Sequence, residues 1–483
     1  MKINYGIKDN GRFTYNKTVI SILYLIISTA ILIFTFAIQN IPQQNWFFFM
    51  AYLITTHWII STIMLLTFKI NIISLSSFFI HLTYVFHFGQ VILIGFFPYY
   101  KFQQFKVADI VRYETFQRAT EFQIMIIAMV VWGILISMKP INIKNTEELM
   151  LENIYARHSN KAAILTGRLI SIVCIPLRLR SDFLKMQASK TGDYFDVFST
   201  AESGIASMFG YFAFVGIAIL IIEYSKSNKK KAEMITIATI LYLITSMLYG
   251  GRGQQLTIIL FYVYVYFKCI RKLKLKSVIM LGILGWLLLI LLNAIFMIRL
   301  NGFPTIDELI WAFQKSLASD PVLKIIEELG GTQYTVVLAM DKIKSLSEAT
   351  LGTTYLSALP LVFINIKGAL DPFIRLSHFA RLLDTPYIGG TYIGELFYNF
   401  RYLGIILAPT IGWFVNYISQ KVDRHIHAKD SIKIAYYIPL FTHTLWWVRD
   451  AFGGWVRISV WGGFIIYILY NILGKKFKIY KDN

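Results

Sequence analysis

The feature that most constrains this chain is a nearly continuous series of apolar stretches, interrupted by one long polar segment at 301–390. About twelve stretches are long and apolar enough to cross a bilayer, nine before that segment and three after it. Because backbone groups in lipid must bond within the chain, such stretches fold as helices. We therefore expect an all-α, polytopic membrane helix bundle. The predicted helices lie at 18–38, 46–67, 72–97, 122–138, 162–178, 205–223, 234–249, 255–270, 276–299, 397–418, 432–448 and 456–473.

Composition supports one integral membrane domain over 1–483, since 56% of the residues are apolar and no Pro/Gly/Ser linker divides the chain. The net charge of +20 does not indicate nucleic acid binding, because the basic residues cluster in short loops between apolar stretches. Cytoplasmic retention and anionic lipid headgroups account for such loops. Cys174 and Cys269 each lie inside an apolar stretch, so neither a disulfide framework nor a thiolate metal site is expected.

The basic loops also predict the orientation in the membrane. Lysine and arginine recur at 139–161, 226–231, 271–276 and 475–481, whereas the opposite loop Ile41–Asn45 carries no charge. The positive-inside rule then places both termini in the cytoplasm and 301–390 outside the plasma membrane. Within 301–390, apolar residues at helical spacing predict short amphipathic helices, which form an external lid or simply lie at the membrane interface. The segment 162–178 holds Pro176 and is expected to be a kinked or partly re-entrant helix.

Arginines gather at the predicted outer ends of the helices. Gly250–Gln254 places glycines and Arg252 at the start of the eighth helix, where free backbone N–H groups and a guanidinium suit phosphate oxygens. The alternative is a tight turn with an arginine at the membrane interface. A rim rich in arginine and poor in acids is what a pyrophosphate needs from a protein that uses no metal or other cofactor. The further residues assigned to substrate binding at this rim are Arg299, Asn399, Arg401, Arg449, Asp450 and Arg457.

The stretch where the chain re-enters the membrane holds the leading catalytic candidate. Glu395 and Asn399 are four residues apart and share one face of a helix. A carboxylate at this depth is costly unless it is paired or functional. We predict that Glu395 is a general base; the alternative is a contact with Asn399 or Arg401 that only fixes the helix. His378 is the only histidine of the long loop and is the second candidate for the base.

The run from Gly394-Glu395 through Asn399-Phe400 to Gly404 is similar to the Gly-Glu and Asn-Phe-Gly pattern of the Wzy-type repeat-unit polymerases of O-antigen and capsule synthesis. Arg401 stands where that family usually has the glycine. The resemblance, which extends to the overall layout, implies a block glycosyl transfer at the outer face of the plasma membrane. The glycan on undecaprenyl pyrophosphate would pass to a hydroxyl of a new lipid-linked repeat unit. Membrane lipids, a flippase and a chain-length regulator are the implied partners, with no role for nucleic acid.

Two other functions remain open. An O-antigen ligase has nearly the same layout and chemistry with a different acceptor, and dependence on a loop histidine such as His378 would favour it. A polysaccharide flippase or other transporter belongs to a different class. It is expected to have two related halves of six helices, a charged central cavity and no large outer loop.

Overall fold

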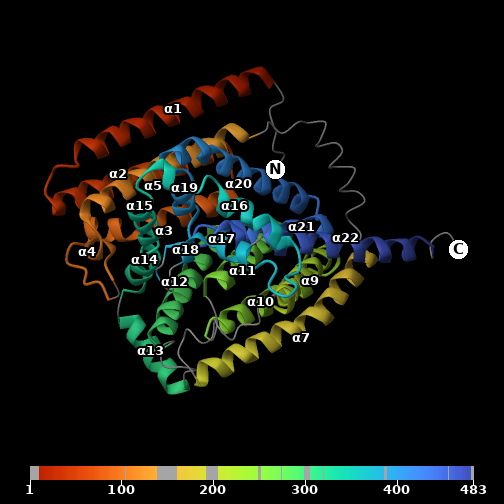
Figure 1. Ribbon diagram of the computed structural model, residues 1–483. Helices are drawn as coiled ribbons and strands as arrows, with labels where there is room; N and C mark the ends of the chain where they lie inside the picture. The colour runs from red at the N-terminus through yellow and green to blue at the C-terminus, as the bar shows by residue number, and fades with distance from the viewer. Residues whose placement is uncertain are drawn as a thin grey trace.

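The computed structural model describes residues 10–103, 105–138, 160–191, 205–248, 252–272, 275–298, 305–318, 320–383, 385, 389–454 and 456–479. Within these residues the secondary structure is helical and contains no strand, which confirms the all-α fold (Figure 1). The helices that correspond to the twelve predicted stretches are α1 (Asn10–Ala37), α2 (Gln43–Thr67), α3 (Leu75–Phe96), α5 (Tyr113–Ser137), α7 (Lys161–Thr191), α9 (Ile205–Ser227), α10 (Lys229–Ser246), α11 (Arg252–Val265) with the π-helical turn η1 (Tyr266–Ile270), α12 (Leu275–Ile298), α19 (Tyr392–Phe400) with α20 (Gly404–His427), α21 (Ser431–Trp446) and α22 (Val456–Ile479).

Nine helical segments of the described chain are long and apolar enough to cross a membrane, so the count of about twelve is not confirmed. The other three fall short for visible reasons. The helix α10 begins with three lysines, α21 has only 16 residues, and the apolar part of α12 covers Gly282–Ile295. The helix α7 continues through Pro176 to Thr191, well beyond the predicted end at 178.

Small residues let the central helices approach each other closely. A Cβ atom at Gly133 of α5 would lie 2.1 Å from the carbonyl oxygen of Pro409 on α20, and one at Gly412 would lie 2.0 Å from that of Val130. Glycine is therefore required on both sides of this contact. Close approach through small residues is a common way to pack helices in a membrane.

The segment 305–383 forms short helices that lie against the bundle. These are α13 (Ile306–Ala318), α14 (Pro321–Gly330), α15 (Gln333–Lys342), η3 (Leu346–Glu348), α16 (Thr353–Ala358), η4 (Leu359–Val362), α17 (Asp371–Ser377) and α18 (Phe379–Leu382). The helix α14 packs on α3 so closely that a Cβ at Gly330 would lie 2.4 Å from the backbone nitrogen of Gln90. In α13, Ser316 accepts a hydrogen bond of 2.8 Å from Asn293 of α12. The external location of this segment stays a prediction.

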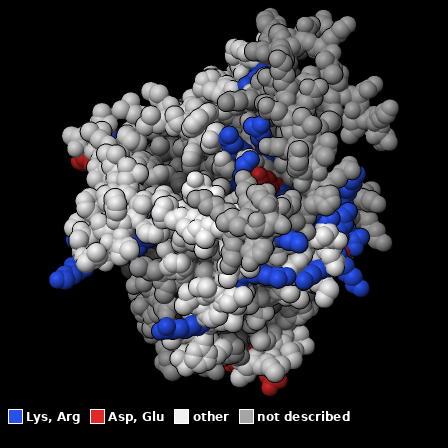
Figure 2. Space-filling view, turned by 90° about the vertical axis from the view of Figure 1, so that its right-hand side faces the viewer, with Lys and Arg blue, Asp and Glu red and all other residues white. Residues whose placement is uncertain are grey.

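Basic side chains gather at one end of the bundle. Figure 2 looks onto the end at which α5 ends, α7 begins and the C-terminus emerges in Figure 1, and lysines and arginines are prominent on it. Glu223 of α9 holds this end together, because its carboxylate accepts hydrogen bonds from Asn160 N, Lys226 Nζ and Ser431 Oγ. Two of the loops that were predicted to share one side of the membrane, 139–161 and 226–231, therefore meet in the fold, together with the start of α21.

Candidate active site

The helix α19 places Glu395 at a junction of three segments. Thr391 caps its N-terminus, and every residue from Tyr392 to Asn399 is buried. Glu395 is 0% exposed. Its Oε1 accepts a hydrogen bond of 2.8 Å from the Thr354 hydroxyl, and its Oε2 accepts bonds of 3.2 Å from the Trp447 indole N–H and 2.9 Å from the Phe452 backbone N–H. The carboxylate thus joins α19 to α16 and to the turn between α21 and α22, which we call the last turn (residues 446–454).

Asn399 extends the same junction by one helical turn. Its Oδ1 accepts a 2.8 Å hydrogen bond from the Thr350 hydroxyl, and its Nδ2 donates bonds of 2.8 Å to Thr354 Oγ1 and to the backbone oxygen of Glu395. The prediction that Glu395 and Asn399 share one face agrees with these contacts. The ion pairs of the described residues do not include one between Glu395 and Arg401. Arg401 Nε is buried without a partner, and its guanidinium carbon lies 5.9 Å from the centre of the Tyr402 ring.

The last turn holds a second carboxylate. Asp450 accepts hydrogen bonds of 2.7 Å from the Trp446 indole N–H and 2.8 Å from the backbone N–H of Ala451. The adjacent Trp446 and Trp447 therefore each fix one carboxylate of the junction. Asp450 and Glu395 also interact electrostatically, so the last turn brings two acidic groups together. A Cβ at Gly390 would lie 2.7 Å from Ala451 N, so this close approach requires glycine in the re-entry segment.

His378 lies where α17 ends and α18 begins, and it is half-buried. Its neighbour Ser377 touches the last turn, because a Cβ at Gly453 would lie 2.8 Å from Ser377 Cβ. Burial lowers the pKa of His378; nearby Arg381 lowers it further, and Asp450 opposes both by raising it. Because the net shift is downward, the imidazole is neutral at neutral pH and able to accept a proton.

The predicted arginine rim is only partly brought together. Arg449 stacks over the Phe86 ring of α3, with its guanidinium carbon 6.0 Å from the ring centre. Arg252 forms an ion pair with Glu328 of α14 and donates a 3.0 Å hydrogen bond to the backbone oxygen of Leu292. The side chains of this pair are only 11% and 10% exposed. Arg457 donates to backbone oxygens of Leu361 and Phe363 in the loop helices.

The first helical turn of α11 nevertheless lies beside the last turn. A Cβ at Gly253 would lie 1.8 Å from the Trp446 ring, the same ring whose indole N–H binds Asp450. Arg252 is thus close to the junction, but its charge is already paired with Glu328. Arg299 and the pair Gly250-Gly251 lie outside the described residues. The predicted rim was poor in acidic residues, whereas Arg252 has an acidic partner in Glu328.

Sequence reasoning missed several residues of this junction. Thr350, Thr354, Trp446 and Trp447 supply its hydrogen-bond donors, and Glu328 neutralises Arg252. The signal was present in Trp446-Trp447, two indole donors that precede Arg449-Asp450 by a single intervening valine. In an apolar helix such donors need acceptors. Nothing in the local sequence indicated that Thr354 is the common hydrogen-bond partner of Glu395 and Asn399.

A comparison with protein families matches residues 18–482 to the O-antigen polysaccharide polymerase Wzy family. The chain belongs to the Wzy family. Comparisons with curated proteins and with solved structures find no match. Membership over nearly the whole chain confirms the resemblance drawn from the re-entry motif. As a Wzy-family protein, the chain is a multi-pass membrane polymerase of the glycosyltransferase type, acting on lipid-linked oligosaccharide in a membrane lipid environment.

Proposed function

We propose that the protein polymerises lipid-linked repeat units of a bacterial surface polysaccharide (O-antigen, capsule or exopolysaccharide) at the outer face of the plasma membrane. The growing glycan is transferred from undecaprenyl pyrophosphate to a hydroxyl of a new lipid-linked unit, without a metal. The observation that carries this proposal is the position of His378 in a Wzy-family chain: it lies beside the last turn, which carries Arg449 and Asp450, and it interacts electrostatically with Asp450.

The reaction requires one bond to form and one to break. The acceptor hydroxyl oxygen attacks the anomeric carbon of the donor, and the bond from that carbon to the pyrophosphate oxygen breaks with its electron pair. The hydroxyl proton goes to a general base, and cationic groups stabilise the charge on the departing pyrophosphate. Arg449 is our candidate for the cationic role, with Arg252 and Arg299 as further candidates. Arg401, Asn399, Asp450 and Arg457 remain candidates for substrate binding or for shaping the site.

We assign the base to His378 rather than Glu395. Both oxygens of Glu395 already accept hydrogen bonds, and the side chain has no exposed surface, which supports a positioning role at the junction. His378 is half-buried, has a lowered pKa and interacts electrostatically with Asp450, so its neutral imidazole is able to accept a proton. His378→Ala is expected to reduce polymerisation about a hundredfold or more while leaving the protein abundant in membranes.

An O-antigen ligase is the second candidate function, because a required loop histidine would also fit a ligase. Purified protein given only lipid-linked repeat units separates the two. A polymerase makes a ladder of longer lipid-linked chains, whereas a ligase makes no product until its own acceptor is added. The proposal fails if no ladder forms under these conditions. The transporter alternative predicts no new glycosidic bond with any acceptor.

The proposed topology has both termini in the cytoplasm, with the loop helices outside and near a flippase and a chain-length regulator. Impermeant thiol labelling in intact cells tests it, using single cysteines at Lys229 and Lys342. We expect labelling at 342 only. The reverse pattern would contradict both the topology and a reaction at the outer face.

A further inference from the structure

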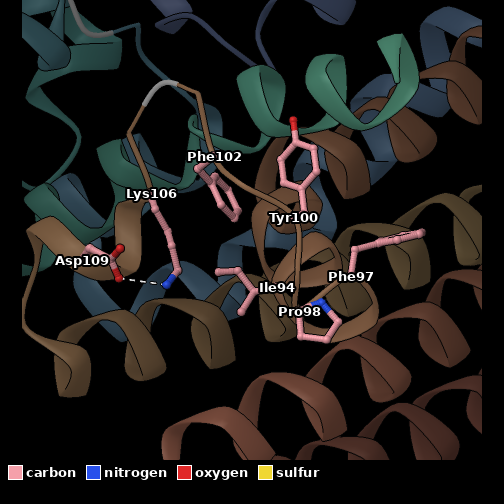
Figure 3. A pocket seen from close by; sticks show the side chains of 7 residues that line it. All are labelled: Ile94, Phe97, Pro98, Tyr100, Phe102, Lys106 and Asp109. Carbon is pink, nitrogen blue, oxygen red and sulfur yellow. Dashed lines mark ion pairs between the residues drawn. The ribbon is translucent and has the colours of Figure 1, made fainter. Parts of the chain in front are cut away.

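A cavity apart from the last turn lies between the end of α3 and the short helix α4 (Val107–Ile110), as Figure 3 shows. Its volume is about 340 Å³. Three aromatic side chains line it, from Phe97, Tyr100 and Phe102, and Lys106 and Asp109 lie at one side. Lys106 Nζ is 2.9 Å from Asp109 Oδ1, and these two side chains are 27% and 59% exposed. The cavity therefore combines ring faces with an accessible, electrically neutral pair of polar groups.

This combination selects among ligand classes. A phosphate group would meet the Asp109 carboxylate as well as the Lys106 ammonium, so the charge balance does not favour an anion. A lipid chain would leave the ion pair desolvated beside it. A sugar ring satisfies both parts, because its C–H face packs on an aromatic ring while its hydroxyls bind an ammonium and a carboxylate.

The cavity is held in shape before any ligand arrives. Tyr100 donates its hydroxyl to Glu327 Oε2 at 2.7 Å, and Gln103 N donates to Glu327 Oε1 at 2.8 Å. Gln90 of α3 accepts a bond of 2.9 Å from Val107 N and donates one of 3.1 Å to the backbone oxygen of Phe105. These contacts hold the loop that connects α3 to α4 against α3 and α14. A preformed site binds its ligand with less loss of entropy.

The helix α3 connects the cavity to the candidate active site. Phe86 of α3 lies under Arg449, and His87 forms a 2.9 Å hydrogen bond with Thr391, the N-cap of α19. Ile94, eight residues further along α3, lines the cavity. At the helical rise this separation is about 12 Å. A glycan that reacts near the last turn and lies along α3 would therefore reach the cavity with a sugar residue remote from the new bond.

We propose that this cavity is a subsite for a neutral sugar residue of the repeat unit, stacked on Phe102 and hydrogen-bonded by Lys106 and Asp109. The inference rests on the proposed function, because it takes the glycan to be the substrate. Such a subsite lets the enzyme recognise its own repeat unit beyond the reacting sugar.

Binding of the free repeat-unit oligosaccharide, released by mild acid from the lipid carrier of the same bacterium, tests the subsite. We would titrate it into purified protein and follow saturation-transfer NMR. Phe102→Ala is expected to weaken binding roughly three- to tenfold, as loss of one aromatic contact implies. Tyr99→Ala is the matched control, because Tyr99 is on the same loop, is 96% exposed and does not line the cavity. An interfacial anchoring role for the aromatic residues would make Tyr99→Ala equally damaging.

A second variant protects the test against misfolding of Phe102→Ala. The double change Lys106→Ala with Asp109→Asn alters only the ion pair beside the cavity and is expected to weaken binding by a similar factor. The inference is overturned if the wild-type protein does not bind the oligosaccharide, if both variants bind as well as wild type, or if Tyr99→Ala loses as much. Ladder formation by the wild-type protein judges the proposed function separately, since it does not depend on the cavity variants.

Discussion

Glu395→Gln distinguishes a positioning role from a basic one at the centre of the junction. Glutamine keeps an oxygen that accepts from the Trp447 indole and the Phe452 backbone N–H. Its amide nitrogen then faces Thr354 Oγ1, which already accepts from Asn399 Nδ2. Two of the three bonds to the side chain are kept, and the third must rearrange.

The magnitudes follow from these bonds. Replacing a charge-assisted bond with a neutral or strained one costs about 1–3 kcal/mol of folding free energy, which most proteins survive. Alanine instead leaves three buried donors without an acceptor, at about 1–3 kcal/mol each, or roughly 3–9 kcal/mol in total. That sum is comparable to the whole stability of a domain. We therefore expect Glu395→Gln to accumulate in membranes and Glu395→Ala to be nearly absent.

The assay reads polymer ladders beside a membrane blot for each variant. If Glu395 only positions the junction, Glu395→Gln makes a recognisable ladder with activity reduced less than about tenfold. If it is the general base, a loss of about a hundredfold or more is expected at normal protein abundance, equivalent to about 2.7 kcal/mol in the barrier. The latter result would refute our assignment of the base to His378.

Three further predictions follow from the junction and its neighbours. Because the pKa of His378 is lowered, activity should persist as pH falls through the ordinary histidine range and decline only below it, which a pH–rate profile measures. Asp450→Asn should move that inflection to still lower pH, because Asp450 raises the pKa of His378. Arg401→Gly should raise the free energy of unfolding by about 1–2 kcal/mol, because Arg401 has φ 49° and ψ −134°, a conformation that favours glycine. A melting assay should show a higher melting temperature, and an unchanged or lower one would contradict backbone strain at this residue. Arg252→Ala should lower the free energy of unfolding by about 3–5 kcal/mol, because it leaves Glu328 buried and unpaired. Leucine at both positions should restore the abundance of the protein on a membrane blot. If the double variant also regains polymerisation, Arg252 does not bind the pyrophosphate.

The sequence predicted the existence of the helices better than their limits. Apolar length identified the stretches that became helices, since it reflects the requirement that backbone in lipid bonds to itself. It did not predict that α7 continues beyond residue 178 to Thr191, or that the tenth stretch divides into α19 and α20 at Arg401–Leu403. Both boundaries depend on local backbone geometry that hydropathy does not contain.

The sequence predicted which site residues are neighbours within one helix, but not which residues of different helices come into contact. Spacing alone placed Glu395 and Asn399 on one face, because residues four apart are neighbours on any helix. No spacing rule connects His378 to Asp450, or Glu395 to Thr354, since these pairs meet only when the loop helices fold onto the last turn. The ion pair of Arg252 was unpredictable for the same reason, because its partner Glu328 comes from a distant helix.

The departure from the family motif at Arg401 has a backbone explanation. Glycine is usual there in the resembling family, and the arginine in this chain puts a close helix packing role at that position in doubt. The positive φ of Arg401 shows that the chain must make a turn between α19 and α20 that strongly favours glycine. This chain tolerates an arginine because the surrounding contacts hold the turn on both sides. Asn399 is bonded to Thr350 and Thr354 before it, and Gly404 packs against Leu396 after it. A strained residue that neighbouring structure holds in place beside a candidate active site is where a specific role for its side chain is best sought.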